Sequence, residues 1–228
     1  MRSLILSGWT QPIDALAHIE TDAATFDYSD YPTLAAAFDA LKNVNHTTCV
    51  AWSMGGQIAL AAIASGALQV AHLTLIAVPY QFVSDVSVSD AMDPLTFNQF
   101  RSNYASNPAR TKTRFHGLVA KGDRDFSRVL GALTHHPEVE NTARWLPWLD
   151  RLAEGSIAAL DLDRVPPTLI IHGAADAIVP VSQAALLAEK LPQVQVHLWP
   201  ESGHAPHVHD AVRLRAEIAA HRALHGIV

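Results

Sequence analysis

The chain of 228 residues contains one cysteine, Cys49, which excludes an internal disulfide and favours a reducing compartment, the cytoplasm. Runs of about 18 apolar residues are absent, so the sequence predicts no membrane span. Met1-Arg2-Ser3 pass directly into an apolar segment, and we therefore expect no signal peptide. The net charge of -6 disfavours nucleic acid as a partner. The 49% of apolar residues is enough for the core of a single domain spanning residues 1–228.

Apolar segments of strand length alternate with helical patterns along most of the chain. Strands are expected near residues 3–7, 23–27, 47–52, 72–78, 167–172 and 194–199. Helices are expected near residues 12–18, 33–42, 54–65, 182–190 and 209–224. This repetition predicts an α/β fold with a mostly parallel, doubly wound sheet of about six strands. The strand near Phe26 becomes a sheet edge, which Asp27 and Asp30 would guard against pairing with another chain.

Residues from about 81 to 160 break the alternation, because several polar helical patterns replace strands there. We predict that they form a helical lid inserted after the strand that ends at Pro79. Between Arg101 and Arg128, seven basic residues accompany two acidic ones, a local charge of +5 that leaves -11 for the rest of the chain. This charge indicates either a docking surface for an acidic partner or a solvated helix face. The docking candidates are Arg110, Arg114, Lys121, Arg124 and Arg128.

The stretch Ala51-Trp52-Ser53-Met54-Gly55 places a serine between an apolar strand and a helix of small residues. A sharp strand–turn–helix of this kind exposes the serine Oγ to a base, and Gly55 and Gly56 let the turn pack closely. The G-x-S-x-G pattern has glycine where this chain has Ala51, a difference of one methyl group. The other interpretation is an ordinary glycine-rich turn between a strand and a helix.

A candidate acid and a candidate base follow two later strands. Asp176 comes after the strand near residues 167–172, and His204 comes after the strand near residues 194–199. The chain order Ser53, Asp176, His204 is the order expected when a doubly wound sheet supplies a catalytic triad. His204 would take the Ser53 proton and return it to the leaving group, while Asp176 would orient the imidazole. Ordinary turn chemistry before a Val-Pro pair also explains Asp176.

Two further histidines, His207 and His209, follow the candidate base and superficially resemble a metal site. Zinc needs ligands that converge on one point, usually from several segments, and His135-His136 is the only other histidine pair. We therefore expect neither a metal nor a cofactor. His207 and His209 are interpreted as loop or helix-start residues.

Acyl transfer places negative charge on the substrate oxygen, and two backbone N–H groups usually stabilise it. Met54 supplies the amide after the serine. Trp9 is the natural second donor, because it follows the strand near residues 3–7 and Gly8 lets the backbone approach closely. Trp9 and Trp52 would flank the serine as an aromatic-walled entrance suited to an acyl chain. A strand-to-helix turn with a buried tryptophan also explains Trp9.

With these motifs in place, the sequence resembles the α/β-hydrolases and, among them, the pimeloyl-acyl carrier protein methyl ester carboxylesterases of biotin synthesis. The segments that carry the resemblance are Ser7-Gly8-Trp9, Trp52-Ser53-Met54-Gly55-Gly56, Leu160-Asp161-Leu162, Ile170-Ile171-His172-Gly173 and Gly203-His204-Ala205-Pro206, with His209 after them. The chain departs from the pattern at Ala51 and at Ser7, where the superfamily often has histidine.

This resemblance implies a cytoplasmic serine carboxylesterase that hydrolyses a methyl or similarly small ester at the end of an acyl chain. It also implies that an acyl carrier protein holds the substrate and docks on the basic lid. We expect a monomer that contacts neither nucleic acid nor membrane. The same triad would serve a short-chain esterase, a thioesterase or a carbon–carbon bond hydrolase. Outside enzymes, the alternative is a small-molecule receptor that keeps the hydrolase pocket.

Overall fold

The computed structural model describes residues 2–20, 23–43, 46–134 and 142–227. Within these ranges, six parallel strands form one sheet in the order β2-β1-β3-β4-β5-β6. The strands are β1 (Ser3–Leu6), β2 (Ala24–Thr25), β3 (Thr48–Trp52), β4 (His72–Ile76), β5 (Thr168–Gly173) and β6 (Val194–Trp199). The predicted α/β class and the parallel sheet are confirmed.

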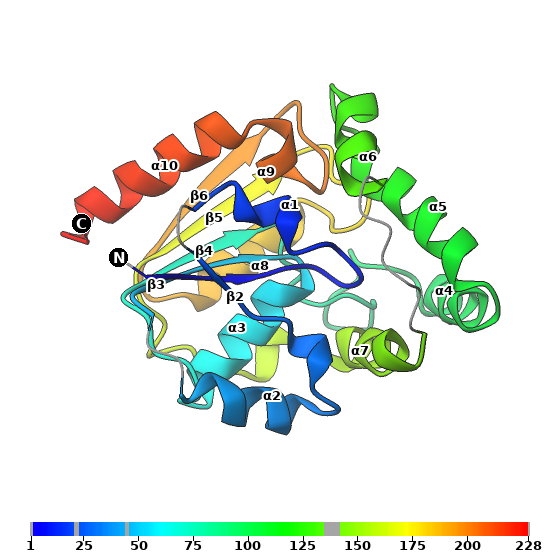
Figure 1. Ribbon diagram of the computed structural model, residues 1–228, viewed down its shortest axis with the longest axis horizontal. Helices are drawn as coiled ribbons and strands as arrows, with labels where there is room; N and C mark the ends of the chain where they lie inside the picture. The colour runs from blue at the N-terminus through cyan, green and yellow to red at the C-terminus, as the bar shows by residue number, and fades with distance from the viewer. Residues whose placement is uncertain (1, 21–22, 44–45, 135–141, 228) are drawn as a thin grey trace.

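Helices cover both faces of this sheet. α2 (Leu34–Leu41) and α3 (Met54–Ala64) lie on one side, and α10 (Ala211–Leu224) lies on the other (Figure 1). α8 (Ser182–Lys190) connects β5 to β6. The shorter elements are α1 (Asp14–Ala17), η1 (Tyr28–Asp30) and α9 (Pro206–His209). Among the described residues, no helix is both long enough and apolar enough to span a membrane.

The central strands are buried along their whole length. β1, β3, β4 and β5 have no exposed residue, as expected when helices cover both faces of a parallel sheet. Cys49 lies in β3, where burial raises the pKa of its thiol to about 12, so this thiol does not supply a thiolate nucleophile at neutral pH. The edge strands differ, since both residues of β2 are exposed, and β6 has three half-buried residues, two exposed and one buried.

A helical insertion separates β4 from β5 and gathers beyond the carboxyl ends of the strands (Figure 1). Its described helices are α4 (Pro94–Ser106), α5 (Pro108–Ala120), α6 (Phe126–Thr134) and α7 (Thr142–Glu154), followed by η2 (Ile157–Ala159). Asn107 forms the corner between α4 and α5, because its side chain accepts a hydrogen bond from the Arg110 amide at 3.1 Å. Pro108 then occupies the first helical position, where its fixed φ favours a helix.

Contacts of Trp9 and Arg144 link the helical insertion to the loops of the sheet. Trp9, in the loop after β1, packs edge-to-face against Tyr104 of α4 with ring centroids 4.7 Å apart. Arg144 of α7 forms ion pairs with both Asp27 and Asp30. These carboxylates therefore anchor α7, and their role as guards of the sheet edge stays a prediction.

Candidate active site

Ser53 stands at the sharp turn between β3 and α3, with φ 52° and ψ -124°. A residue with a side chain reaches positive φ only under local strain, and such strain is typical of a serine held at the top of a strand. The two following glycines are required by close packing. A Cβ on Gly55 would lie 2.5 Å from two carbonyl oxygens at the end of β1, and one on Gly56 would overlap Val78. The turn keeps its shape although Ala51 replaces glycine.

A hydrogen-bond chain joins the three residues predicted as a triad. His204 Nε2 lies 3.0 Å from Ser53 Oγ, and His204 Nδ1 lies 2.7 Å from Asp176 Oδ2. Ser53 is 7% exposed and His204 is 1% exposed, so little water reaches the pair. With the Nδ1 proton donated to Asp176, Nε2 carries the lone pair that accepts the serine proton. The structure brings together the groups that nucleophilic acyl transfer needs.

The two oxygens of Asp176 have different partners. Oδ1 accepts the amides of Ile178 and Val179 at 2.8 and 2.9 Å, which is the turn-forming role. Oδ2 faces His204 and, at 3.4 Å, Nε2 of His172. Burial raises the pKa of Asp176, but the charges and hydrogen bonds of His204 and His172 outweigh burial and hold this pKa below its ordinary value. Asp176 therefore forms the turn and also bonds the candidate base, and its carboxylate is ionised at neutral pH.

Met54 directly follows Ser53, and the loop that carries Trp9 approaches the serine closely. Met54 is the first residue of α3, so its N–H has no acceptor within the helix. A Cβ on Gly8 would lie 3.3 Å from Ser53 Cβ, which shows how closely the loop after β1 approaches the serine. Trp9 follows, and Thr10 has a positive φ of 53° where the loop turns. The stabilisation of an oxyanion by Trp9 and Met54 stays a prediction.

Trp52 packs inside the protein beside the candidate base. It is fully buried, its Nε1 donates to the His204 carbonyl oxygen at 2.8 Å, and its ring centroid lies 4.3 Å from that of His207. The ring therefore supports the His204 loop from inside the protein, and the predicted substrate contact of Trp52 stays a prediction. Trp9 is 2% exposed and donates to the Trp145 carbonyl oxygen at 3.0 Å, and its contact with substrate stays a prediction.

The other two histidines of this segment have separate partners. His207 packs on Trp52, and burial lowers its pKa well below the ordinary value. Nδ1 of His209 lies 2.7 Å from Oδ1 of Asp123. Among the described residues, no group of three or more potential metal ligands converges. His135-His136 lie outside the described residues.

The predicted docking residues divide into paired and unpaired cations. Arg124 pairs with Glu201 at 2.7 Å, and Arg128 pairs with Asp125 at 2.9 Å. These two charges are partly neutralised within the protein, which the sequence did not predict. The exposed members without an ion-pair partner in the described part of the chain are Arg110, Arg114 and Lys121.

Two residues close to the triad were not predicted. His172, the one histidine of β5, bonds the Val179 carbonyl oxygen at 3.0 Å and reaches the candidate acid. The sequence did offer a signal for His172, because this histidine stands one residue before the glycine that ends β5. Asp123 belongs to the helical insertion, yet its Oδ2 accepts the Gly203 amide at 3.3 Å. No sequence signal links these two positions, because the contact depends on how the insertion packs.

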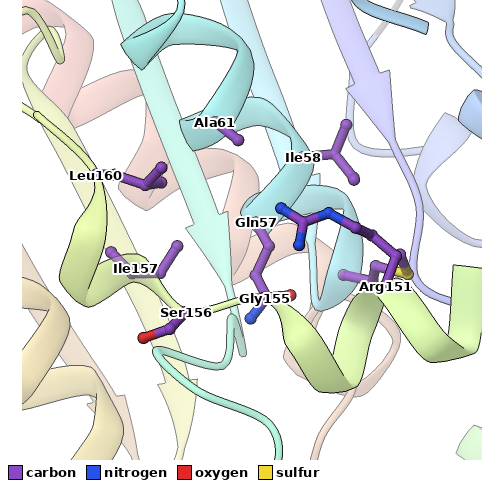
Figure 2. A pocket seen from close by; sticks show the side chains of 9 residues that line it. Gln57, Ile58, Ala61, Arg151, Gly155, Ser156, Ile157 and Leu160 are labelled. Atoms are coloured by element: carbon purple, nitrogen blue, oxygen red, sulfur yellow. The ribbon is translucent and has the colours of Figure 1, made fainter. Parts of the chain in front are cut away.

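A cavity of about 20 Å³ lies between α3 and the end of α7, and Met54 and Gln57 are among its lining residues. Figure 2 shows Arg151 and Gln57 on facing sides of this space, with Gly155 between them. The volume suffices for about one water molecule, so this cavity does not hold an acyl chain.

The profile of the alpha/beta hydrolase family matches residues 10–217. The chain therefore belongs to the α/β-hydrolase family. Within it, the chain is 35% identical to pimeloyl-[acyl-carrier protein] methyl ester esterase of Aromatoleum aromaticum, over 77% of this chain and 74% of that one. The protein of the same name from Nitrosomonas europaea is 31% identical, over 68% of this chain and 63% of its own length. Biotin biosynthesis bifunctional protein BioHC of Cellvibrio japonicus is 31% identical, over 77% of this chain and 35% of its own length.

Solved structures share the fold at low sequence identity. Bromoperoxidase from Bacillus anthracis gives a TM-score of 0.79 at 18% identity, covering 97% of this chain and 91% of that one. The esterase EaEST from Exiguobacterium antarcticum gives a TM-score of 0.76 at 17% identity, covering 96% of this chain and 91% of that one. These similarities concern the fold alone.

Proposed function

We propose that the protein is a serine carboxylic ester hydrolase that acts on the methyl, or a similarly small, ester of an acyl chain. The observation that carries this proposal is the hydrogen-bond chain from Ser53 through His204 to Asp176, built on a strained turn. Support comes from the two pimeloyl-[acyl-carrier protein] methyl ester esterases, which are 31% and 35% identical to the chain.

In the first half of the reaction, Ser53 Oγ attacks the ester carbonyl carbon while His204 Nε2 takes the hydroxyl proton. The Trp9 and Met54 amides donate hydrogen bonds to the oxyanion of the tetrahedral intermediate. The intermediate collapses when the carbon–alkoxy bond breaks and His204 gives its proton to the departing oxygen. Methanol leaves, and an acyl-serine remains. The ionised Asp176 stabilises the imidazolium throughout.

In the second half, water replaces the alcohol. His204 takes a proton from this water, whose oxygen attacks the acyl carbonyl carbon. The bond to Ser53 Oγ then breaks, the serine regains its proton from His204, and the free carboxylic acid leaves. Substrate, water and the three side chains supply every atom and proton of this cycle.

The substrate carrier is proposed to be an acyl carrier protein that docks on the outer face of α4 and α5. A groove of about 490 Å³ lies between these helices and includes Leu95, Leu118 and Arg114 in its lining. Leu95 is 78% exposed and Leu118 is 40% exposed, so the groove offers apolar surface to a partner. Arg110 and Lys121 add positive charge on the same helix and just after it. An acidic carrier would be attracted to this surface.

Access to the serine also requires movement. Because Ser53 is 7% exposed beneath the helical insertion, an acyl chain reaches it only when part of this insertion shifts. Docking of the carrier on α4 and α5 would place the mobile acyl arm next to the helices that must move. The helical insertion would then act as the lid predicted from the sequence.

The proposal is tested by initial rates on pimeloyl-acyl carrier protein methyl ester and on a free short-chain p-nitrophenyl ester. We expect kcat/KM to be about 100-fold higher for the carrier-bound ester, because remote contacts contribute to transition-state binding. Equal values would indicate a general short-chain esterase. Faster cleavage of the thioester link to the carrier would indicate a thioesterase. One equivalent of product without turnover would indicate a receptor.

A further inference from the structure

The connection between α5 and α6, residues 121–125, lies between the loops that carry the triad acid and base. On the side of the base, the His204 amide donates to the Val119 carbonyl oxygen at 3.3 Å. On the side of the acid, Gly122 has φ 87°, and a Cβ on it would overlap the Ala175 carbonyl oxygen. The helical insertion is therefore in backbone contact with both catalytic loops.

Asp123 lies at the centre of this connection, and its side chain is fully buried. Oδ2 accepts the Gly203 amide and the Ser202 hydroxyl, both at 3.3 Å. Oδ1 accepts the Asp125 amide at 2.9 Å and lies 2.7 Å from Nδ1 of His209. Three of these four partners belong to the segment that surrounds the catalytic base.

Burying a carboxylate is costly unless its oxygens accept hydrogen bonds. The Asp123 carboxylate and its four partners therefore hold one another in place. Gly203 directly precedes His204. Movement of the Gly203 backbone therefore displaces the His204 imidazole. The imidazole must keep two hydrogen bonds, at 3.0 Å to Ser53 and at 2.7 Å to Asp176. A displacement of about 1 Å in such a site lowers catalysis by about 100-fold.

We propose that Asp123, assisted by His209, is a positioning residue of this active site. Its carboxylate holds residues 202–204 so that the His204 imidazole stays within hydrogen-bond reach of Ser53 and Asp176. This inference rests on the proposed esterase function and adds to it a residue of the helical insertion. The insertion then serves the chemistry directly, in addition to covering the site.

The test compares Asp123→Asn with Asp125→Asn, the same chemical change in the same connection. The Asp125 side chain bonds Arg128, whose guanidinium also donates to the His209 carbonyl oxygen. Asp125→Asn therefore leaves the Asp123 carboxylate and its partners unchanged and acts on the His204 segment only through Arg128. Asparagine replaces one carboxylate oxygen with an NH₂ group, which cannot accept a hydrogen bond. Either the donors to Oδ1 or the donors to Oδ2 then lose their acceptor. We expect kcat on the free p-nitrophenyl ester to fall by about 10- to 100-fold in Asp123→Asn, with KM within about twofold. Asp125→Asn should stay within about twofold of the wild type in both constants.

Rates are expressed per active site, counted by covalent titration of Ser53 with a fluorophosphonate. A residue that only stabilised the fold would lower the number of labelled sites and leave kcat per site unchanged. A positioning residue also lowers the rate of labelling, because that reaction uses the same serine–histidine pair. We expect the labelling rate and kcat to fall in the same proportion in Asp123→Asn.

His209 provides a second test that is independent of the buried carboxylate. His209→Ala removes the Nδ1 donor and should lower kcat per site by about fivefold. His209→Asn places an amide N–H near the same point and should restore kcat to within about twofold of the wild type. If Asp123→Asn does not fold, the comparison of His209→Ala with His209→Asn tests the positioning role.

The proposal is overturned if Asp123→Asn keeps kcat per site within twofold of the wild type, or if Asp125→Asn loses as much. It is also overturned if His209→Asn is no better than His209→Ala. Ser53→Ala is measured in parallel. Retained activity in Ser53→Ala contradicts the esterase mechanism itself, whereas an inactive Ser53→Ala beside a fully active Asp123→Asn contradicts the positioning role alone.

Discussion

At the scale of single residues, the candidate site depends on how one imidazole is held. His204 bonds Asp176 through Nδ1 and Ser53 through Nε2, and its carbonyl oxygen accepts Nε1–H of Trp52. The lowered pKa of Asp176 means that the folded protein favours the ionised carboxylate. The stability gained from this ionisation is fully present above the pKa of an unfolded aspartate and is lost as the pH falls through the lower pKa of the folded state. Protonation of Asp176 therefore does not limit activity near neutral pH.

His204→Ala and Asp176→Asn should each lower kcat by about 10³- to 10⁴-fold, because triad members act as a unit. His207→Ala should lower it less than about tenfold, since His207 contacts Trp52 and makes no bond to Ser53. The measurement is the steady-state rate on the free p-nitrophenyl ester with equal amounts of folded protein. EDTA should leave the wild-type rate unchanged. A loss of activity in EDTA that zinc restores would contradict this mechanism and support a metal site.

At the scale of elements, three strand ends each deliver one group of the candidate triad. The turn between β3 and α3 carries Ser53, the loop after β5 carries Asp176, and the loop after β6 carries His204. This arrangement follows from a parallel sheet, whose carboxyl ends lie along one edge. α5 contributes on two faces, because Phe115 packs against Trp9 inside the protein while Arg110 and Arg114 face the solvent.

Reversal of the unpaired cations tests the docking face of α5. Arg110→Glu combined with Arg114→Glu should raise KM for the carrier-bound ester about tenfold and leave the free ester within about twofold. The matched control is Lys42→Glu combined with Arg164→Glu, which changes the net charge equally at exposed positions outside the helical insertion. Carrier-dependent activity should also fall as salt rises, since exposed charges are screened within about 8 to 10 Å. An equal rise of KM in the control would mean that net charge, and not docking on α5, causes the effect.

At the scale of the whole molecule, the sequence predicted the fold better than the contacts around the site. The strands were predictable because buried parallel strands are nearly continuous apolar runs, as in β1 and β3. Ser53 and Asp176 were predictable because each follows such a run, and His204 was predictable because it follows the strand expected near residues 194–199. The direction of Trp52 and the bond from Asp123 to Gly203 were not predictable, because both depend on how distant segments pack. The monomeric state and the cytoplasmic location stay predictions.

The central claim is that Ser53 is the nucleophile of an ester hydrolase. The most direct test is the release of methanol from pimeloyl-acyl carrier protein methyl ester by wild-type protein and by Ser53→Ala, with thermal unfolding of both as the control for folding. We predict steady turnover by the wild type and a loss of about 10⁴-fold or more in Ser53→Ala at an unchanged unfolding temperature. A folded Ser53→Ala protein that keeps more than about 5% of the wild-type rate would contradict the claim, since losses of several powers of ten are expected when a triad member is removed.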